Sequence, residues 1–335
     1  MTEIAVLGAG SWGIAISTLL NYNGHKVTLW EFDRQERKRL SIQREHKEKL
    51  PGVTIPDRVE ITDQLDLAVS KADMLTLALP SHTVREVAKK IDSIKLKDPI
   101  VVNLAKGVEN KTLLRMSEVL KQELPADLHE RITTLSGPSH AEEVARKIPT
   151  TVVVAGFREE AARAVQHAFM NPYFRVYTNS DIIGVELGGS IKNVIAIAVG
   201  ICDGMGLGDN SKGALISRGL AEIIRLGEKL GAKQETFAGL SGLGDLVTTC
   251  ISRFSRNRFV GEQIGRGKSL EEILEEMVMV AEGVKTAESA FQLSQKHEVE
   301  MPITAQVYQI LFENKKPERA LRELMTRDPK SEIWS

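Results

Sequence analysis

Apolar runs alternate with segments of helical periodicity along the first 180 residues of the chain. The runs are short and rich in β-branched residues, which is typical of strands buried within a sheet. Strands are predicted at residues 4–7, 26–30, 74–79, 100–104, 132–135, 151–155 and 174–177, and helices at 14–20, 81–91, 112–124 and 158–170. Ser81 is expected to cap the helix at 81–91. This alternation predicts a parallel, doubly wound sheet.

The pattern changes after residue 180. Long segments of helical periodicity follow, glycine loops separate them, and none of the apolar runs predicts a strand. Ser269 and Glu272 have the spacing of a capping box, and Pro302 and Pro317 are each expected to start a helix. We therefore predict two domains, an α/β domain with a Rossmann-type doubly wound sheet at residues 1–180 and an all-α domain at residues 181–335.

Residues 182–201 are apolar over a length that could cross a bilayer. The segment contains Glu186 and Lys192, and a charged side chain near the middle of a bilayer is costly. A helix buried within the second domain fits this composition better, so no membrane span is predicted.

The composition narrows the function classes. The chain has 335 residues, of which 42% are hydrophobic and 5% aromatic, and its formal net charge is −1, which argues against a nucleic-acid-binding protein. Cys202 and Cys250 are far apart and belong to no C-x-x-C pair, so neither a disulfide framework nor a thiolate metal site is expected. No basic stretch precedes the first apolar run, so no signal peptide is predicted, and a cytoplasmic location is expected.

A glycine pattern follows the first predicted strand. The segment Gly8-Ala-Gly10-Ser-Trp-Gly13 has the spacing G-x-G-x-x-G and opens a predicted helix. Gly8 permits a tight turn, Gly10 lets the backbone approach a pyrophosphate, and Gly13 lets the helix pack on the strand. The sequence therefore predicts a dinucleotide at the start of this helix.

The end of the second predicted strand bears on the choice between NAD and NADP. Glu31 and Asp33 could each bond the ribose 2′-hydroxyl of NAD. Arg34 and the basic residues at 37–39 could hold the 2′-phosphate of NADP, or they could form a solvated helix face. The choice stays open.

Two polar segments follow predicted strands, at the sheet edge where ligands bind in doubly wound folds. Lys106, after residues 100–104, could meet an anion or a carbonyl group, or could lie on the surface. The segment Ser136-Gly-Pro-Ser139 offers donors to a substrate, or forms a plain turn. His140 has no evident partner, and no role is assigned to it.

Lys192 lies in the apolar segment that is predicted to be buried. Burial disfavours the ammonium form and lowers the lysine pKa, which makes Lys192 a candidate general base near neutral pH. The alternative is a structural ion pair with Glu186 or with a more distant acid.

The region from Gly239 to Arg258 combines a glycine-rich loop with Asp245 and the segment Ser255-Arg256-Asn257-Arg258. Arginine and asparagine beside a flexible loop suit a phosphate, although a solvated basic loop is the commoner fate of such runs. We see no spacing of metal ligands in the sequence, so no metal is expected.

These segments together resemble the bacterial-type NAD(P)-dependent sn-glycerol-3-phosphate dehydrogenases. The resemblance covers nearly the whole chain, and its segments occur in the order of the family. They are Gly8–Gly13, Leu104-Ala-Lys-Gly-Val-Glu109, Leu135-Ser-Gly-Pro-Ser-His-Ala-Glu-Glu143, Lys192-Asn193, residues 200–210, Gly242-Leu-Gly-Asp-Leu246, Ser255-Arg-Asn-Arg258 and Ala281-Glu-Gly-Val284.

The resemblance implies reversible reduction of dihydroxyacetone phosphate to sn-glycerol 3-phosphate, for glycerophospholipid synthesis, by a homo-oligomer that we expect to be a dimer. It implies that Lys192 is the proton donor and acceptor and that Lys106 meets both cofactor and substrate. The other substrate contacts that it implies are Gly137, Ser139, Asp245, Ser255, Arg256 and Asn257. The expected cofactor contacts combine those from the glycine pattern, those from the end of the second predicted strand and those that the resemblance implies. They are Gly8, Gly10, Ser11, Trp12, Gly13, Glu31, Phe32, Arg34, Lys106, Ala141, Arg256, Val280 and Glu282.

One position departs from the family. In that family the residue two places after the strand-end tryptophan is often basic, whereas this chain has Phe32 at that position.

Two other functions remain as alternatives: another hydroxy-acid dehydrogenase with the same order of domains, and a non-catalytic regulator that senses nicotinamide nucleotides. A helix-turn-helix segment before the glycine pattern would favour the regulator, and we find none.

Overall fold

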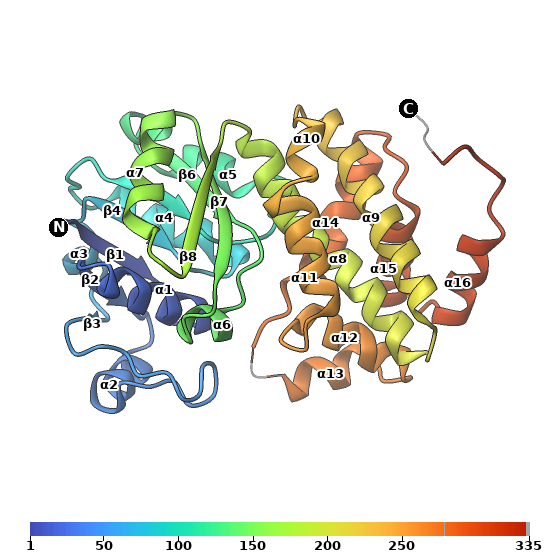
Figure 1. Ribbon diagram of the computed structural model, residues 1–335, viewed down its shortest axis with the longest axis horizontal. Coiled ribbons are helices and arrows are strands. Elements are labelled where there is room, and N and C mark those ends of the chain that lie inside the picture. Colours follow the sequence, from blue (N-terminus) through green and yellow to red (C-terminus); the bar gives the residue numbers. More distant parts are fainter. Residues whose placement is uncertain (278, 333–335) are drawn as a thin grey trace.

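The computed structural model describes residues 1–277 and 279–332, which form a half that contains a sheet and a half that is helical. Figure 1 shows the sheet and its flanking helices on the left and helices α8 to α16 on the right. The eight strands of the described residues lie side by side in the order β3-β2-β1-β4-β5-β6-β7-β8. They are β1 (Glu3–Leu7), β2 (Lys26–Trp30), β3 (Glu60–Thr62), β4 (Met74–Leu77), β5 (Ile100–Asn103), β6 (Ile132–Ser136), β7 (Thr150–Gly156) and β8 (Phe174–Asn179).

Helices cover both faces of the sheet, because alternate strand residues point to opposite faces and both sets are apolar. In β1, Ile4 and Val6 join a core with α1 and α7, whereas Ala5 and Leu7 join a second core with α4 and α5. The helices of this half are α1 (Ser11–Tyr22), α2 (Arg34–Gln43), α3 (Leu65–Val69), α4 (Val84–Asp92), α5 (Met116–Glu123), α6 (Ala141–Ala145) and α7 (Glu159–Phe169).

The prediction of a parallel sheet is wrong for the last two strands, because β8 is parallel to β7 and both run opposite to the other six. All pairs from β3 to β6 are parallel, but β7 runs antiparallel to β6. The connection at residues 137–149 holds only the short helix α6, which packs on α1. A parallel connection would have to cross a face of the sheet, usually with a full helix. This connection stays at the edge where β6 ends, so β7 returns in the opposite direction.

Several predicted boundaries also need correction. Ser81 lies in a 3₁₀ turn, η1 (Ser81–Thr83), and its side chain caps no helix, because α4 begins only at Val84. The helix expected from residue 112 begins at Met116, after a loop in which Val108 and Arg115 form a β-bridge. Strand β3 and helices α3 and α6 were not predicted, because they are too short for a period to show, and the strongly polar α2 was considered only as an alternative for its basic residues.

The helical half is built around α8 (Ile182–Gly204), which begins directly after β8. Of the described residues it forms the one helix long and apolar enough to cross a membrane, and 94% of that window is buried within the protein, as expected for a core helix. The other elements of this half are α9 (Asp209–Lys229), α10 (Gln234–Phe237), η3 (Leu240–Gly244), α11 (Asp245–Ile251), α12 (Arg256–Gly265), α13 (Leu270–Glu276), α14 (Glu282–Lys296), α15 (Pro302–Phe312) and α16 (Pro317–Met325).

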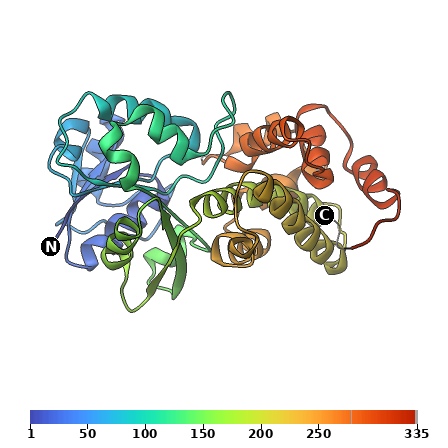
Figure 2. The same cartoon turned by 90° about the horizontal axis from the view of Figure 1, so that it is seen from above.

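Glycines bring α8 and α12 into close contact. A Cβ at Gly200 would lie 2.0 Å from the carbonyl oxygen of Arg258, and one at Gly261 would lie 2.0 Å from that of Ile197. The two helices therefore pack backbone against backbone. Figure 2 shows α8 running from the sheet into the helical half.

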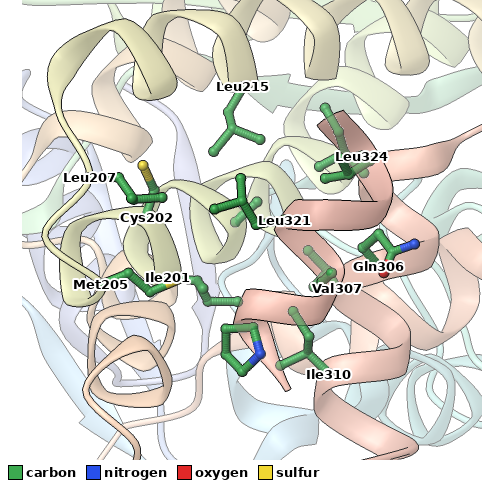
Figure 3. Close-up of a pocket in the computed structure, with 14 residues that line it drawn as sticks. Ile201, Cys202, Met205, Leu207, Leu215, Gln306, Val307, Ile310, Leu321 and Leu324 are labelled. Carbon is green, nitrogen blue, oxygen red and sulfur yellow. The ribbon is translucent and has the colours of Figure 1, made fainter. Parts of the chain in front are cut away.

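The last helix covers a small apolar cavity of about 60 Å³ at the far end of α8. Figure 3 shows Ile201 of α8, Leu215 of α9 and Leu321 of α16 among its lining residues. Of the polar side chains, only that of Gln306 contributes to the lining, so the cavity belongs to the hydrophobic packing under α16.

Candidate active site

The turn between β1 and α1 has the backbone that the glycine pattern predicts. Gly8 has a φ of +106°, and a Cβ there would lie 2.7 Å from the carbonyl oxygen of Ala78. A Cβ at Gly13 would lie 1.8 Å from the carbonyl oxygen of Gly8. Gly10 differs, because no atom lies within 4 Å of the place that its Cβ would fill. The first and last glycines are thus required by packing, and the middle one faces open space.

That open space lies at the start of α1, where the residues Gly10, Ser11 and Trp12 expose backbone N–H groups. No side chain caps this helix and no acidic residue occupies its first turn. It also lies at the ends of β1 and β4, where the strand order reverses. An uncapped helix N-terminus at such a point fits the pyrophosphate of a dinucleotide.

The end of β2 places Glu31 and Asp33 differently. Glu31 is buried and accepts a hydrogen bond from the backbone N–H of Asp33 at 3.1 Å, and burial raises the pKa of its carboxyl. Asp33 caps α2 by accepting from the N–H of Glu36. The side chains of Phe32 and Arg34 are both largely exposed, and Arg34 lies 3.6 Å from Asp63.

Two lysines from opposite halves of the molecule meet at one carboxylate. The Nζ of Lys192, on α8, lies 2.9 Å from Oδ1 of Asp245, at the start of α11. The Nζ of Lys106, after β5, lies 2.6 Å from Oδ2 of the same residue and 3.0 Å from the carbonyl oxygen of Gly137. Lys192 and Asp245 are each less than 5% exposed, whereas the Lys106 side chain is 19% exposed.

The prediction that Lys192 is buried is confirmed, and the surroundings set its proton affinity. Burial, with a contribution from the charge of Lys106, lowers its pKa to about 8, although Asp245 opposes the shift. Burial alone would raise the pKa of Asp245, but the two ammonium groups hold it below its usual range. Burial and the same cations lower the pKa of His140 to about 4, so its imidazole is neutral.

Glu186 is an alternative partner of Lys192 on sequence grounds, and the structure excludes it. Glu186 instead accepts hydrogen bonds from Arg115, Ser117 and Thr134. Six residues along a helix place two side chains on different faces, so Glu186 and Lys192 point apart.

Thr249 contacts this cluster and was not predicted. Its Oγ1 accepts a hydrogen bond from Nζ of Lys192 and donates to the carbonyl oxygen of Asp245 at 2.6 Å. It lies four residues after Asp245 on α11, so it occupies the same helix face. That spacing was the one signal in the sequence that could have identified it.

The segment Ser255-Arg256-Asn257 forms the start of α12. Ser255 caps the helix through its Oγ, which accepts from the N–H of Arg258. Asn257 is bonded on both sides, donating to Oδ1 of Asn193 at 2.9 Å and accepting from the N–H of Gly283. Arg256 is exposed and donates to the carbonyl oxygen of Val280 at 2.7 Å. An arginine at a helix N-terminus suits an anion.

The remaining predicted residues lie between the two halves. The carboxylate of Glu282, at the start of α14, accepts the backbone N–H of Ser81 at 2.9 Å, so it joins the helical half to the end of β4. Gly137 has a φ of +126°, and its carbonyl oxygen also accepts from Ser139 Oγ. Ala141 begins α6 and is buried.

Within residues 1–277 and 279–332, no group of three or more His, Cys, Asp or Glu side chains could hold a metal ion. The polar atoms of the cluster are instead cations and one carboxylate in mutual contact. This arrangement can move a proton at Lys192 and stabilise negative charge beside Lys106.

Comparison with known proteins gives matches over both halves. The family described as "NAD-dependent glycerol-3-phosphate dehydrogenase N-terminus" matches residues 3–162, and the one described as the C-terminus of the same enzyme matches residues 181–322. The "Glycerol-3-phosphate dehydrogenase [NAD(P)+]" of Thermoanaerobacter sp. (strain X514) is 53% identical over 99% of each chain, and that of Fusobacterium nucleatum is 49% identical over the full length of both.

Solved structures agree with these matches. The crystal structure of glycerol-3-phosphate dehydrogenase from Coxiella burnetii superposes with a TM-score of 0.92 at 36% identity, covering 97% of this chain and 99% of that one. A ternary structure of D-mandelate dehydrogenase has a TM-score of 0.59 at 14% identity and covers 95% of this chain and 99% of its own, which shows a shared fold alone.

Proposed function

The chain belongs to the family of NAD-dependent glycerol-3-phosphate dehydrogenases, and from this premise we propose how its own residues carry out the reaction. The reaction is the reversible reduction of dihydroxyacetone phosphate to sn-glycerol 3-phosphate. The observation that carries the proposal is the buried Lys192, held by Asp245 and Thr249 and close to Lys106 at the sheet edge.

The dinucleotide fits the open, uncapped start of α1, with Gly8, Gly10, Ser11, Trp12 and Gly13 around its pyrophosphate. Ala141, Val280 and Glu282 would contact it from the junction of the two halves. When bound, its nicotinamide supplies or removes the hydride at C2 of the substrate. Glu31, Phe32 and Arg34 would surround the adenosine ribose.

In the direction of reduction, Lys192 donates a proton to the C2 oxygen as negative charge develops there. Lys106 stabilises the same charge and holds its own place through Asp245 and the carbonyl oxygen of Gly137. In the direction of oxidation, neutral Lys192 takes the proton from the C2 hydroxyl. A pKa of about 8 serves both directions near neutral pH.

The phosphate would bind at the start of α12, where Ser255, Arg256 and Asn257 lie. The helix N-terminus and the Arg256 guanidinium both favour an anion. Ser139 and Gly137 would contact the substrate from the end of β6. Holding the phosphate fixes C2 against the nicotinamide, so its binding energy should also raise the rate.

The direct test is the oxidation of NADH and of NADPH, each measured with dihydroxyacetone phosphate. We expect turnover with at least one of them, and the ratio of the two kcat/KM values gives the cofactor preference. Small hydroxy and keto acids serve as competing substrates. Turnover confined to those acids would indicate a different dehydrogenase, and cofactor binding without any turnover would indicate a sensor.

The pH dependence of kcat should follow Lys192. Because reduction needs its ammonium form, kcat for reduction should fall as pH rises through about 8, and kcat for oxidation should rise over the same range. Steady-state rates at saturating substrates between pH 6 and 10 measure both limbs. Two limbs that move in the same direction would remove Lys192 as the shared proton carrier.

Gly10→Ala should weaken cofactor binding without loosening the fold. Gly10 has a φ of −72°, which alanine tolerates, and its added methyl group meets no protein atom. The methyl group would occupy space needed by the pyrophosphate, so the Kd for NADH should rise by about tenfold or more. Gly213→Ala, at an equally open position in α9, is the control and should leave the Kd unchanged. Fluorescence titration with NADH measures both, and equal Kd values would place the pyrophosphate elsewhere.

Arg256→Ala should raise KM for dihydroxyacetone phosphate by about tenfold or more, the value of one charge-assisted hydrogen bond. It should leave the poor use of unphosphorylated dihydroxyacetone unchanged. Arg253→Ala is the matched control, because Arg253 lies in the loop just before α12 and stacks on Phe254. Equal losses on both substrates would exclude Arg256 from the phosphate site.

Four broader points belong to the same proposal. We place the domain boundary near residue 180, between β8 and α8. We propose that the enzyme works in the cytoplasm, supplies glycerol 3-phosphate for glycerophospholipids, and assembles as a homodimer. Light scattering of the purified protein would test the last point.

A further inference from the structure

One buried carboxylate joins the two halves of the molecule close to the lysines. Glu186 lies in the second turn of α8, and its side chain is 4% exposed. Its Oε2 accepts from Nη1 of Arg115 at 2.7 Å and from Oγ of Ser117 at 2.6 Å. Its Oε1 accepts from the N–H of Ser117 at 2.8 Å and from Oγ1 of Thr134 at 3.2 Å. Four donated hydrogen bonds therefore satisfy both oxygens of the Glu186 carboxyl group.

All of these donors belong to the half that contains the sheet, and each leads to the active site. Arg115 forms a β-bridge with Val108, two residues after Lys106. Thr134 lies on β6, which ends one residue before Gly137. Glu186 therefore contacts β6, which leads to the Gly137 partner of Lys106, and Arg115, which is bridged to the segment that follows Lys106.

On α8, Gly189 lies three residues after Glu186, and Asn193 lies four residues after Gly189. These spacings place the three residues on the same face of the helix. A Cβ at Gly189 would lie 2.4 Å from Oγ of Ser136 and 3.8 Å from Cγ of Lys106, so α8 touches the sheet edge there. Lys192 lies six residues after Glu186, which is about 9 Å along the helix axis at 1.5 Å per residue. A shift of α8 relative to the sheet would carry Lys192 with it.

We propose that Glu186 is a positioning residue, which fixes α8 against α5 and β6 and so sets the place of Lys192 relative to Lys106 and Gly137. This rests on the proposed function of Lys192. Lys192 and its partners Asp245 and Thr249 all lie in the helical half, so they would move together if the bonds of Glu186 were lost. Lys106 would stay with the sheet.

Glu186→Gln tests the proposal, because an amide keeps the size of the side chain but turns an NH₂ group toward donors. We expect kcat for dihydroxyacetone phosphate to fall by about tenfold or more, with the Kd for NADH changed less than about twofold. Lys106 lowers the pKa of Lys192, while Asp245 raises it, and His140 and Cys250 face the same cluster. Moving Lys106 away should therefore shift the pH profile of kcat to higher pH.

Glu118→Gln is the matched control. Glu118 pairs with Arg115 at 3.1 Å and accepts its N–H, and both contacts lie within the half that contains the sheet. It should lower the stability of α5 and leave both kcat and the pH profile unchanged. Thr134→Val removes one hydrogen bond to Glu186 at nearly constant side-chain shape, so it should give a smaller loss of kcat. It also tests the positioning role if the Glu186→Gln variant does not fold.

The wild-type rate is read first in the same assay. Absence of wild-type turnover would overturn the proposed function. A wild type that turns over, beside Glu186→Gln and Thr134→Val variants with unchanged kcat and pH profile, would overturn the positioning role alone. The positioning role is also overturned if Glu118→Gln loses as much kcat as Glu186→Gln.

Discussion

Lys192→Met should lower kcat for reduction of dihydroxyacetone phosphate by at least about 100-fold, because a methionine side chain has no proton to donate. Methionine fills nearly the volume of the buried lysine stem, and Asp245 keeps Lys106 as its ion partner. The fold should therefore remain. Single-turnover and steady-state rates with saturating NADH measure the loss.

Cofactor affinity distinguishes lost chemistry from lost structure. Lys192 lies on α8, whereas the glycine turn lies between β1 and α1, so the Kd for NADH should stay within about twofold of the wild type. A Lys192→Met enzyme with near-normal kcat would show that another group moves the proton. Lys106, which binds the same carboxylate, and Thr249 are the alternatives within this cluster.

Asp245→Asn is expected to have the second largest effect. Its carboxylate is the counter-charge for two ammonium groups in a buried site, and an asparagine leaves those two cations facing each other. Breaking such a pair costs about 3–5 kcal/mol of the free energy of unfolding. The pKa of Lys192 should fall further, so its proton is lost at neutral pH and kcat for reduction should fall by about 100-fold.

Denaturant unfolding and the pH profile of kcat measure the two parts of this effect. Asp203→Asn is the control, because Asp203 also bridges two cations, Arg258 and Lys212, in the same half of the molecule. That side chain is 20% exposed, so its loss should cost less stability and should not move the pH profile. An Asp245→Asn enzyme with the wild-type profile would contradict the assigned role of Asp245.

Much of the fold could be predicted because its signals are local. The glycine spacing after β1 demanded a particular backbone, and Gly8 and Gly13 have it. The burial of Lys192 followed from an apolar helix with no polar face. The absence of strands after residue 180 also agrees with the described residues.

The remaining features depend on contacts between distant segments. Asp245 reaches Lys106 across the junction of the two halves, and no spacing rule links positions so far apart in sequence. Glu186 was a plausible partner for Lys192 by proximity in the chain, but helix geometry turns it toward Arg115. The direction of β7 depends on where the short helix α6 packs, and the pattern of apolar residues within a strand carries no information about that packing.

Rescue by external amines tests the central role of the Lys192 amine most directly. Lys192→Ala removes the amine and leaves space for a small primary amine beside Asp245 and Thr249. We expect kcat for reduction to be very low without an amine and to rise with added methylamine or ethylamine, with a pH dependence that follows the pKa of the amine used. A Lys192→Ala enzyme that turns over near the wild-type rate without any amine, or that ignores added amines at every pH, would contradict it.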